Sequence, residues 1–207
     1  MFRRLTAVAA LMAVSFSAQA GLTTLTGGDW PPAGSSGLQD VLFNKQTSAG
    51  GAMVAIGAHA YKNGAFLAND GVRNFYAQSG TYAPDGKNYA NWSFDFSYNL
   101  GANCTGCKVF LGIDSDQTAG VNFVDSELTA AFGPVALNSW NMEMNFLSPF
   151  NFDPFSASST DFRLYVTDAN GARLVSSDIT VNVPEPGALA LVAVALAGLG
   201  LSRRRKA

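Results

Sequence analysis

The 207-residue chain has very little of what most enzyme sites are built from. It contains one histidine, His59, and two cysteines, too few for a zinc site that needs four ligands. It has no Gly-x-Ser-x-Gly, no His-Glu-x-x-His and no phosphate-binding glycine loop. His59 lies between two alanines on an expected strand, away from any serine or cysteine nucleophile motif. We therefore expect no catalytic residue, no cofactor and no enzymatic activity.

The chain also lacks an apolar run of the roughly 20 residues that an unaided membrane span requires. Its first 20 residues have instead the three parts of a secretory signal peptide. These parts are a basic start, an apolar stretch and a small-x-small cleavage site: Arg3 and Arg4, Leu5–Phe16, and Ala18-Gln19-Ala20. We expect signal peptidase to cut between Ala20 and Gly21, after export through the general pathway.

The other apolar run lies near the C-terminus and spans 15 residues, 187–201. The tripeptide Pro184-Glu185-Pro186 precedes it, and the basic cluster Arg203, Arg204, Arg205 and Lys206 follows it. Such a cluster resists crossing a membrane and stays on the cytoplasmic side. We expect a short transmembrane helix that holds the preceding chain outside the inner membrane.

This order of tripeptide, short apolar span and terminal basic cluster resembles the PEP-CTERM sorting signal of exported bacterial proteins. The resemblance covers 183–207 and implies recognition by an exosortase, cleavage near the tripeptide and transfer to the cell surface or extracellular matrix. An ordinary tail anchor is the alternative. The chain then divides into a signal peptide (1–20), an ectodomain (21–183) and a sorting signal (184–207).

Cations are scarce in the ectodomain. Seven lysines and arginines oppose 14 aspartates and glutamates, a net charge of −7, although the whole chain sums to −2. Nucleic acid is a poor partner for such a domain, because it requires clustered cations. A length of 163 residues is that of one domain with a proper core.

No stretch of a dozen ectodomain residues keeps a helical period. Short apolar runs alternate with turn signals, which predicts an all-β, antiparallel, jelly-roll-like β-sandwich. The clearest strand is 91–99, where Trp92, Phe94, Phe96 and Tyr98 should face the core and Ser93, Asp95 and Ser97 should face water. Residues 108–113 are expected to be its hairpin partner.

Further strands are expected where apolar residues alternate in 140–146 and 162–166. A turn at 168–171 should lead into a last strand at 174–183, and 125–132 could form one or two helical turns. Segments 92–96, 111–116 and 161–165 also resemble ectodomains found ahead of this sorting signal, which implies a β-sandwich but no reaction.

Cys104 and Cys107 have the Cys-x-x-Cys spacing of redox sites. Those sites place the motif at a helix N-terminus, which lowers the pKa of the first thiol, whereas this one lies in a glycine-rich loop. In an exported protein a structural disulfide is the better interpretation. Free thiols, a redox site and a metal site remain alternatives.

Asp114 and Asp116 begin a run with oxygen ligands at alternate positions, as in calcium-binding loops. The run departs from the EF-hand, because Ala119 takes the glycine position and Asp125 the final glutamate position. An ordinary acidic turn is the favoured interpretation, and Asp114 and Asp116 are a weak calcium candidate.

Aromatic residues are abundant, and most should fill the core. An exposed subset, drawn from Trp30, Tyr76, Tyr82 and Tyr89, could stack on sugar rings. We expect a non-enzymatic structural or adhesive component of the exopolysaccharide or biofilm matrix. A carbohydrate-binding module is the alternative, and a secreted hydrolase with a carboxylate pair is a less favoured one.

Overall fold

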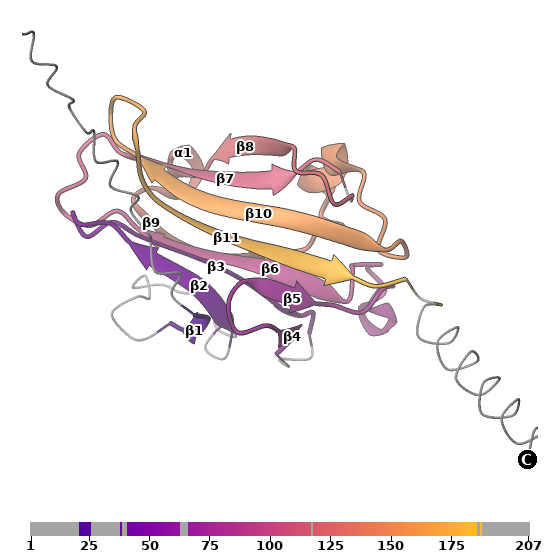
Figure 1. Cartoon of the computed structure of the whole chain (residues 1–207). Coiled ribbons are helices and arrows are strands. Elements are labelled where there is room, and N and C mark those ends of the chain that lie inside the picture. Colours follow the sequence, from indigo (N-terminus) through magenta and orange to yellow (C-terminus); the bar gives the residue numbers. More distant parts are fainter. Residues whose placement is uncertain are drawn as a thin grey trace, which may run out of the picture.

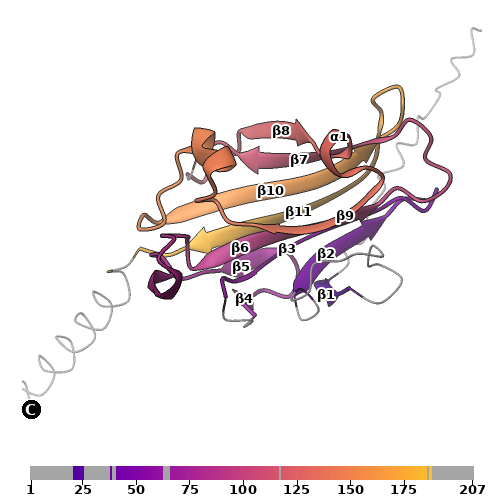
Figure 2. The ribbon, with the colours of Figure 1, turned by 180° about the vertical axis from the view of Figure 1, so that it is seen from behind.

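The computed structural model describes residues 21–25, 38, 41–62, 66–116, 118–185 and 187. In this part the chain is all-β, with two sheets packed face to face and a few short helical turns (Figure 1 and, from behind, Figure 2). The predicted β-sandwich is confirmed. The predicted signal peptide, the apolar run and the basic C-terminal cluster lie outside the described residues.

One sheet has five strands in the order β1-β2-β3-β6-β9, and every pairing in it is antiparallel. Its long central strands, β3 and β6, pair over eight residues each. The strands are β1 (Thr23–Thr24), β2 (Leu42–Thr47), β3 (Met53–Ala60), β6 (Trp92–Asn99) and β9 (Val135–Trp140).

The other sheet has six strands in the order β4-β5-β11-β10-β7-β8. They are β4 (Ala68–Asn69), β5 (Asn74–Tyr76), β7 (Lys108–Asp114), β8 (Phe123–Glu127), β10 (Ser158–Thr167) and β11 (Arg173–Val183). The β5–β11 pair is parallel, so the expectation of a purely antiparallel sandwich was wrong in this detail. No hairpin joins these two strands, and their direction is therefore not dictated by a turn.

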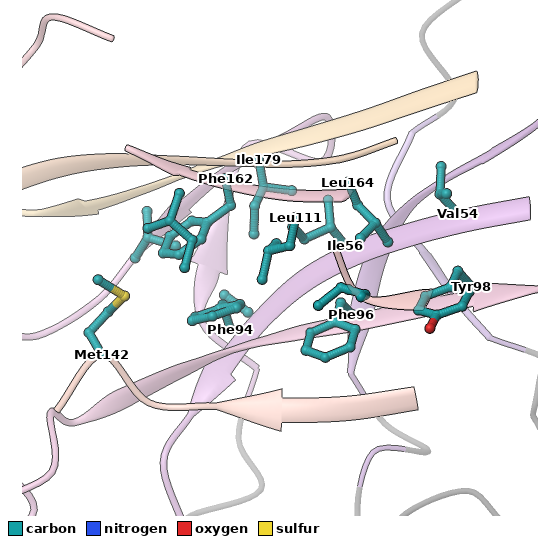
Figure 3. Packing of buried hydrophobic residues seen from close by; sticks show 14 of the residues in the cluster. Val54, Ile56, Phe94, Phe96, Tyr98, Leu111, Met142, Phe162, Leu164 and Ile179 are labelled. Carbon is teal, nitrogen blue, oxygen red and sulfur yellow. The ribbon is translucent and has the colours of Figure 1, made fainter. Parts of the chain in front are cut away.

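The core lies between the two sheets (Figure 3). The predicted aromatic row of β6 is confirmed, because Trp92, Phe94, Phe96 and Tyr98 are all buried. Side chains of the six-stranded sheet pack against this row: Leu111, Phe162, Leu164 and Ile179. Phe94 and Phe162 stack across the interface with ring centroids 4.5 Å apart. Alternation of side chains along paired strands produces this layered interior.

The alternate residues of β6 were expected to face water, and this was wrong. Ser93, Asp95 and Ser97 are buried. A second apolar cluster lies on this outer side of the five-stranded sheet and is formed by Leu25, Leu38, Val41, Phe43, Met53, Ala55 and Leu137. Polar residues that alternate with apolar ones mark the face away from the core, but they do not tell whether another segment covers that face.

The predicted hairpin between 91–99 and 108–113 was also wrong. β7 pairs with β10 and β8 in the six-stranded sheet, whereas β6 pairs with β3 and β9 in the other. The loop that contains Cys104 and Cys107 therefore connects the two sheets. Neighbouring strands with a short connection predict a hairpin, but a sandwich also places such pairs in opposite layers.

The alternation in 140–146 does not form a strand. β9 ends at Trp140, and a 3-10 helix follows at Asn145–Phe150. The Asn141 side chain accepts the Glu143 backbone N–H, and this local turn replaces the extended backbone. In 125–132 only Thr129–Phe132 (α1) is helical, because residues up to Glu127 belong to β8.

The predictions for the last two strands hold. β10 contains Phe162, Leu164 and Val166 facing the core, a turn follows at 168–171, and β11 runs to Val183. β11 lies between β10 and β5, so the sorting signal follows an interior strand of the sheet. Among the described residues no helix has the length and hydropathy to cross a membrane.

Candidate functional site

The sorting signal begins where the sandwich ends. Pro184 and Glu185 follow β11 directly and are exposed, so the start of the tripeptide is accessible. Gly21, the predicted first residue after signal cleavage, is exposed just ahead of β1. The remaining predicted processing residues lie outside the described part of the chain: Ala18, Ala20, Pro186, Arg203, Arg204, Arg205 and Lys206.

The six-stranded sheet turns one face away from the core, and we call it the outer sheet face. Along β10 its side chains alternate with the buried Phe162 and Leu164, as the pleat requires. All three arginines of the ectodomain lie on this face or at its border, although the domain is acidic. The face includes Arg73, Phe110, Asp161, Arg163, Tyr165, Arg173, Ser176 and Asp178.

A depression of about 650 Å³ lies at one end of this face. Phe110 of β7 stacks on Tyr165 of β10, with ring centroids 5.3 Å apart and planes inclined by 17°. The Arg173 guanidinium carbon lies 4.1 Å from the Tyr165 ring centroid. The depression is lined by Lys108, Phe110, Tyr165, Thr167, Asp168, Ala169, Asn170, Gly171 and Arg173. It thus combines an aromatic wall, the cations Lys108 and Arg173, and a turn whose polar groups include the Asp168 carboxylate.

Next to it, a depression of about 350 Å³ shares Arg173 with the first. Two carboxylates line it, and each has a partner within the protein. Asp161 accepts a hydrogen bond from the Thr180 hydroxyl at 2.5 Å, and Asp178 forms an ion pair with Arg73. The first contact joins β10 to β11, and the second joins β11 to the residue just before β5.

Arg163 lines the smaller depression and is fixed from several sides. Its Nε and Nη2 donate to the two oxygens of Asp125 at 3.1 and 2.6 Å, and its guanidinium lies 4.1 Å from the Phe123 ring centroid. Gly112 leaves room for this pair, because a Cβ at that position would lie 2.5 Å from the Asp125 carboxylate and 2.7 Å from the Arg163 side chain. Neither Arg163 nor Arg173 was predicted from the sequence as a site residue.

Tyr165 belongs to the same network. Burial raises the pKa of its hydroxyl, and the hydrogen bond that it donates to Asp125 raises it further. Tyr165 therefore stays protonated and keeps donating at physiological pH. The alternation Asp161, Arg163, Tyr165 was a signal in the sequence for this face, since these residues occupy every second position of a strand.

A second aromatic group lies at another place, on the loops around β3 and the 3-10 turn Ala83–Asp85. Tyr61 packs edge-on against Tyr82 and Tyr89, at 5.6 and 5.5 Å between ring centroids. Two of the predicted sugar-stacking residues thus lie together, but both are only partly exposed. Tyr76 is 48% exposed on its own strand, and Trp30 lies outside the described residues.

His59 has a partner that the sequence did not reveal. Its Nδ1 lies 2.7 Å from Oδ2 of Asp95, on the neighbouring strand. Burial raises the pKa of Asp95, while hydrogen bonds from His59 and Ser139 oppose this effect. The carboxylate lies between the imidazole and the serine. A serine nucleophile mechanism instead requires the imidazole between serine and carboxylate.

The calcium candidate has other contacts. One oxygen of Asp114 accepts the Asn122 backbone N–H at 2.9 Å, and its other oxygen is buried without a hydrogen bond. Asp116 accepts hydrogen bonds from the hydroxyl and the backbone N–H of Thr118. Among the described residues no three acidic, histidine or cysteine side chains are grouped as metal ligands. These contacts are those of an acidic turn.

Cys104 and Cys107 lie at disulfide distance, with their sulfurs 2.09 Å apart. Both pack against the core cluster. Their loop also touches the turn that lines the larger depression, since a Cβ at Gly106 would lie 3.1 Å from the Ala169 side chain. The bond thus closes a loop that supports one end of the outer sheet face.

The fold and the C-terminal sequence together define a class: an exported protein whose ectodomain is a β-sandwich. The chain carries a PEP-CTERM protein-sorting motif at residues 182–206. This motif is a sorting signal recognised by exosortase, so the protein is exported and directed to the cell surface. The resemblance seen in the sequence is confirmed. No curated protein is significantly similar to the chain in sequence.

Proposed function

We propose that the protein is a non-enzymatic structural or adhesive component of the exopolysaccharide or biofilm matrix. The observation that carries this proposal is that the ectodomain of a surface-sorted chain presents the outer sheet face. This face offers two adjoining depressions with aromatic and cationic linings, whereas the five-stranded sheet has an apolar cluster on its own outer side. A concave, partly apolar surface with a few convergent polar groups favours ligand binding.

The experiment is a pull-down of the protein with polysaccharide extracted from the matrix of its native host. We expect the protein to remain with the polysaccharide through washing, and the protein lacking 182–207 to be lost from the cell surface while still binding in vitro. Absence of the protein from the matrix, together with no binding to the extracted polysaccharide, would overturn the proposal.

A carbohydrate-binding module proper is the second candidate. The stacked Phe110 and Tyr165, and the separate group of Tyr61, Tyr82 and Tyr89, favour it. The two groups lie in different parts of the sandwich, so alanine variants distinguish them. Loss of polysaccharide binding in Phe110→Ala but not in Tyr89→Ala would assign binding to the outer sheet face.

A secreted hydrolase is the least favoured candidate, and one carboxylate pair gives it a test. The pKa of Glu143 is raised by partial burial and then by the negative charge of Asp153. A raised pKa suits a general acid. If the protein is not an enzyme, the wild type and Glu143→Gln should give the same reducing-sugar level with matrix polysaccharide. Release of reducing sugar by the wild type that the variant loses would establish the hydrolase.

The processing steps are part of the same proposal. Signal peptidase cuts before Gly21, the run 187–201 anchors the chain transiently in the inner membrane, and exosortase removes it near Pro184. Mass spectrometry of both termini of the protein from its native host tests the two cuts.

The sandwich is proposed to be jelly-roll-like, since the chain crosses between the sheets repeatedly, as at β5–β6–β7 and at β8–β9–β10.

A further inference from the structure

Arg173 differs from the other cations on and around the outer sheet face. Arg73 pairs with Asp178, Lys108 with Glu127 and Arg163 with Asp125. Among the described residues no carboxylate lies within ion-pair distance of Arg173, and its guanidinium lies against the Tyr165 ring. Its side chain is exposed and lines both depressions.

The contact with the ring holds the guanidinium without using its hydrogen-bonding capacity. A guanidinium that lies against an aromatic ring keeps its N–H donors available at its planar edge. Tyr165 is itself held in place by Phe110 on the neighbouring strand and by its hydrogen bond to Asp125. Arg173 therefore presents a positioned, exposed fork of N–H donors that is not paired with a carboxylate of the described residues.

The surroundings of this fork indicate the kind of anion. A carboxylate matches the fork by accepting two parallel N–H bonds. Thr167 and the turn 168–171 place hydroxyl, amide and backbone polar groups around the depression, and Phe110 gives it an apolar wall. The turn also contributes the Asp168 carboxylate, whose Oδ1 accepts the backbone N–H groups of Asn170 and Ala172 within the turn. A sugar ring carries both matching parts, since it has C–H groups on its faces and hydroxyls around its rim.

We propose that the larger depression binds an acidic polysaccharide, with the carboxylate of one sugar unit held by Arg173. This inference rests on the proposed function and names the substrate class of that site. The ectodomain carries a net charge of −7, which repels a polyanion at long range. Salt screens that repulsion within about 8–10 Å, so short-range contacts at Arg173 decide binding.

The probes are polygalacturonate and the same polymer after reduction of its carboxyl groups, used in affinity electrophoresis with the full ectodomain and tail. The wild type should bind the acidic polymer and show at least about tenfold weaker binding to the reduced one. Arg173→Gln should lose the preference, and Arg173→Lys should keep part of it, because it keeps the charge but not the fork.

Lys45→Gln is the matched control. It removes one positive charge from β2 in the five-stranded sheet, outside the two depressions and outside the group of Tyr61, Tyr82 and Tyr89. We expect it to bind both polymers like the wild type. Arg173 is exposed, so its variants should keep the melting temperature of the wild type, and circular dichroism checks this in the same samples.

Equal binding of the acidic and reduced polymers, or an Arg173→Gln protein that binds like the wild type, would overturn the inference and leave the proposed function standing. Binding of poly-glutamate as tight as that of polygalacturonate would also overturn it, because the site would then recognise any carboxylate chain. Failure to bind any of these polymers overturns the inference. Failure to bind host matrix polysaccharide, together with absence of the protein from the matrix, overturns the proposed function as well.

Discussion

Replacement of Asn141 should be among the most destabilising polar substitutions in this sandwich. The side chain is fully buried. Its amide oxygen accepts the Ala90 and Glu143 backbone N–H groups at 3.0 and 3.2 Å, and its nitrogen donates to the carbonyls of Ala90 and Trp92 at 3.0 and 2.7 Å. The amide thus pairs with Ala90 as a neighbouring strand would.

Asn141→Ala leaves the buried N–H and C=O of Ala90 without these partners. An unsatisfied buried polar group costs about 1–3 kcal/mol, so two cost roughly 2–6 kcal/mol. This is a large part of the roughly 5–15 kcal/mol by which domains are stable. Urea unfolding followed by tryptophan fluorescence measures the difference, and Trp92 and Trp140 on either side of the residue report it.

Two further variants give the control and the test of mechanism. Asn99→Ala removes a single exposed hydrogen bond to Gly101 and should cost about 1 kcal/mol or less. Asn141→Asp keeps the acceptor but puts a carboxylate against two carbonyls, so burial should raise its pKa above the unfolded value. Its stability should then rise as the pH falls through that pKa. An Asn141→Ala protein within about 0.5 kcal/mol of wild type would refute the reasoning.

Four other outcomes follow from the structure. Gly112→Ala should cost about 1–3 kcal/mol in urea unfolding, because the new methyl group displaces the ion pair over it, whereas Gly50→Ala should be nearly neutral. Burial raises the pKa of Tyr98 to about 12, so the unfolded state ionises first. Stability should therefore fall as the pH rises from about 10 to 12, by at most about 1.4 kcal/mol per pH unit. Tyr98→Phe should flatten that slope, and equal slopes would contradict it. Thiol titration should find no free thiol before reduction, and reduction of the small Cys104–Cys107 ring should lower stability by only about 2 kcal/mol; two reactive thiols would exclude the disulfide. A chelator should leave the melting temperature unchanged. A melting temperature lowered by the chelator would establish calcium binding in the loop after β7.

The layered core could be predicted from the sequence because period-two alternation determines which side chains share a face. The apolar residues of β6 and β10 are buried as expected: Trp92, Phe94, Phe96, Tyr98, Phe162, Leu164 and Val166. Partner strands could not be predicted in the same way. The short connection from β6 to β7 favoured a hairpin, but the chain crosses between the sheets there, and only the packing of the whole sandwich decides between the two.

Local hydrogen bonds also overrode the pattern. Trp140, Met142, Met144 and Phe146 alternate as cleanly as a strand. The Asn141 amide nevertheless bonds to the backbone of Ala90 and accepts the Glu143 N–H, and the chain turns there ahead of the 3-10 helix Asn145–Phe150. The contacts of that amide join residues about 50 positions apart in the sequence. A pattern within one segment carries no information about a partner at that distance.

The candidate site was missed for a related reason. The polar positions of β6 (Ser93, Asp95) and of β10 (Arg163, Tyr165) both alternate with buried apolar side chains, and alternation alone predicts that both sets face water. An apolar cluster lies on the side of the first set, whereas the second set lines the two depressions. What separates them in the sequence is side-chain size and charge: a covered face takes small or internally paired polar groups, and an open face accepts arginines that reach water. In an acidic domain, the three ectodomain arginines were therefore the best available signal for the exposed sheet.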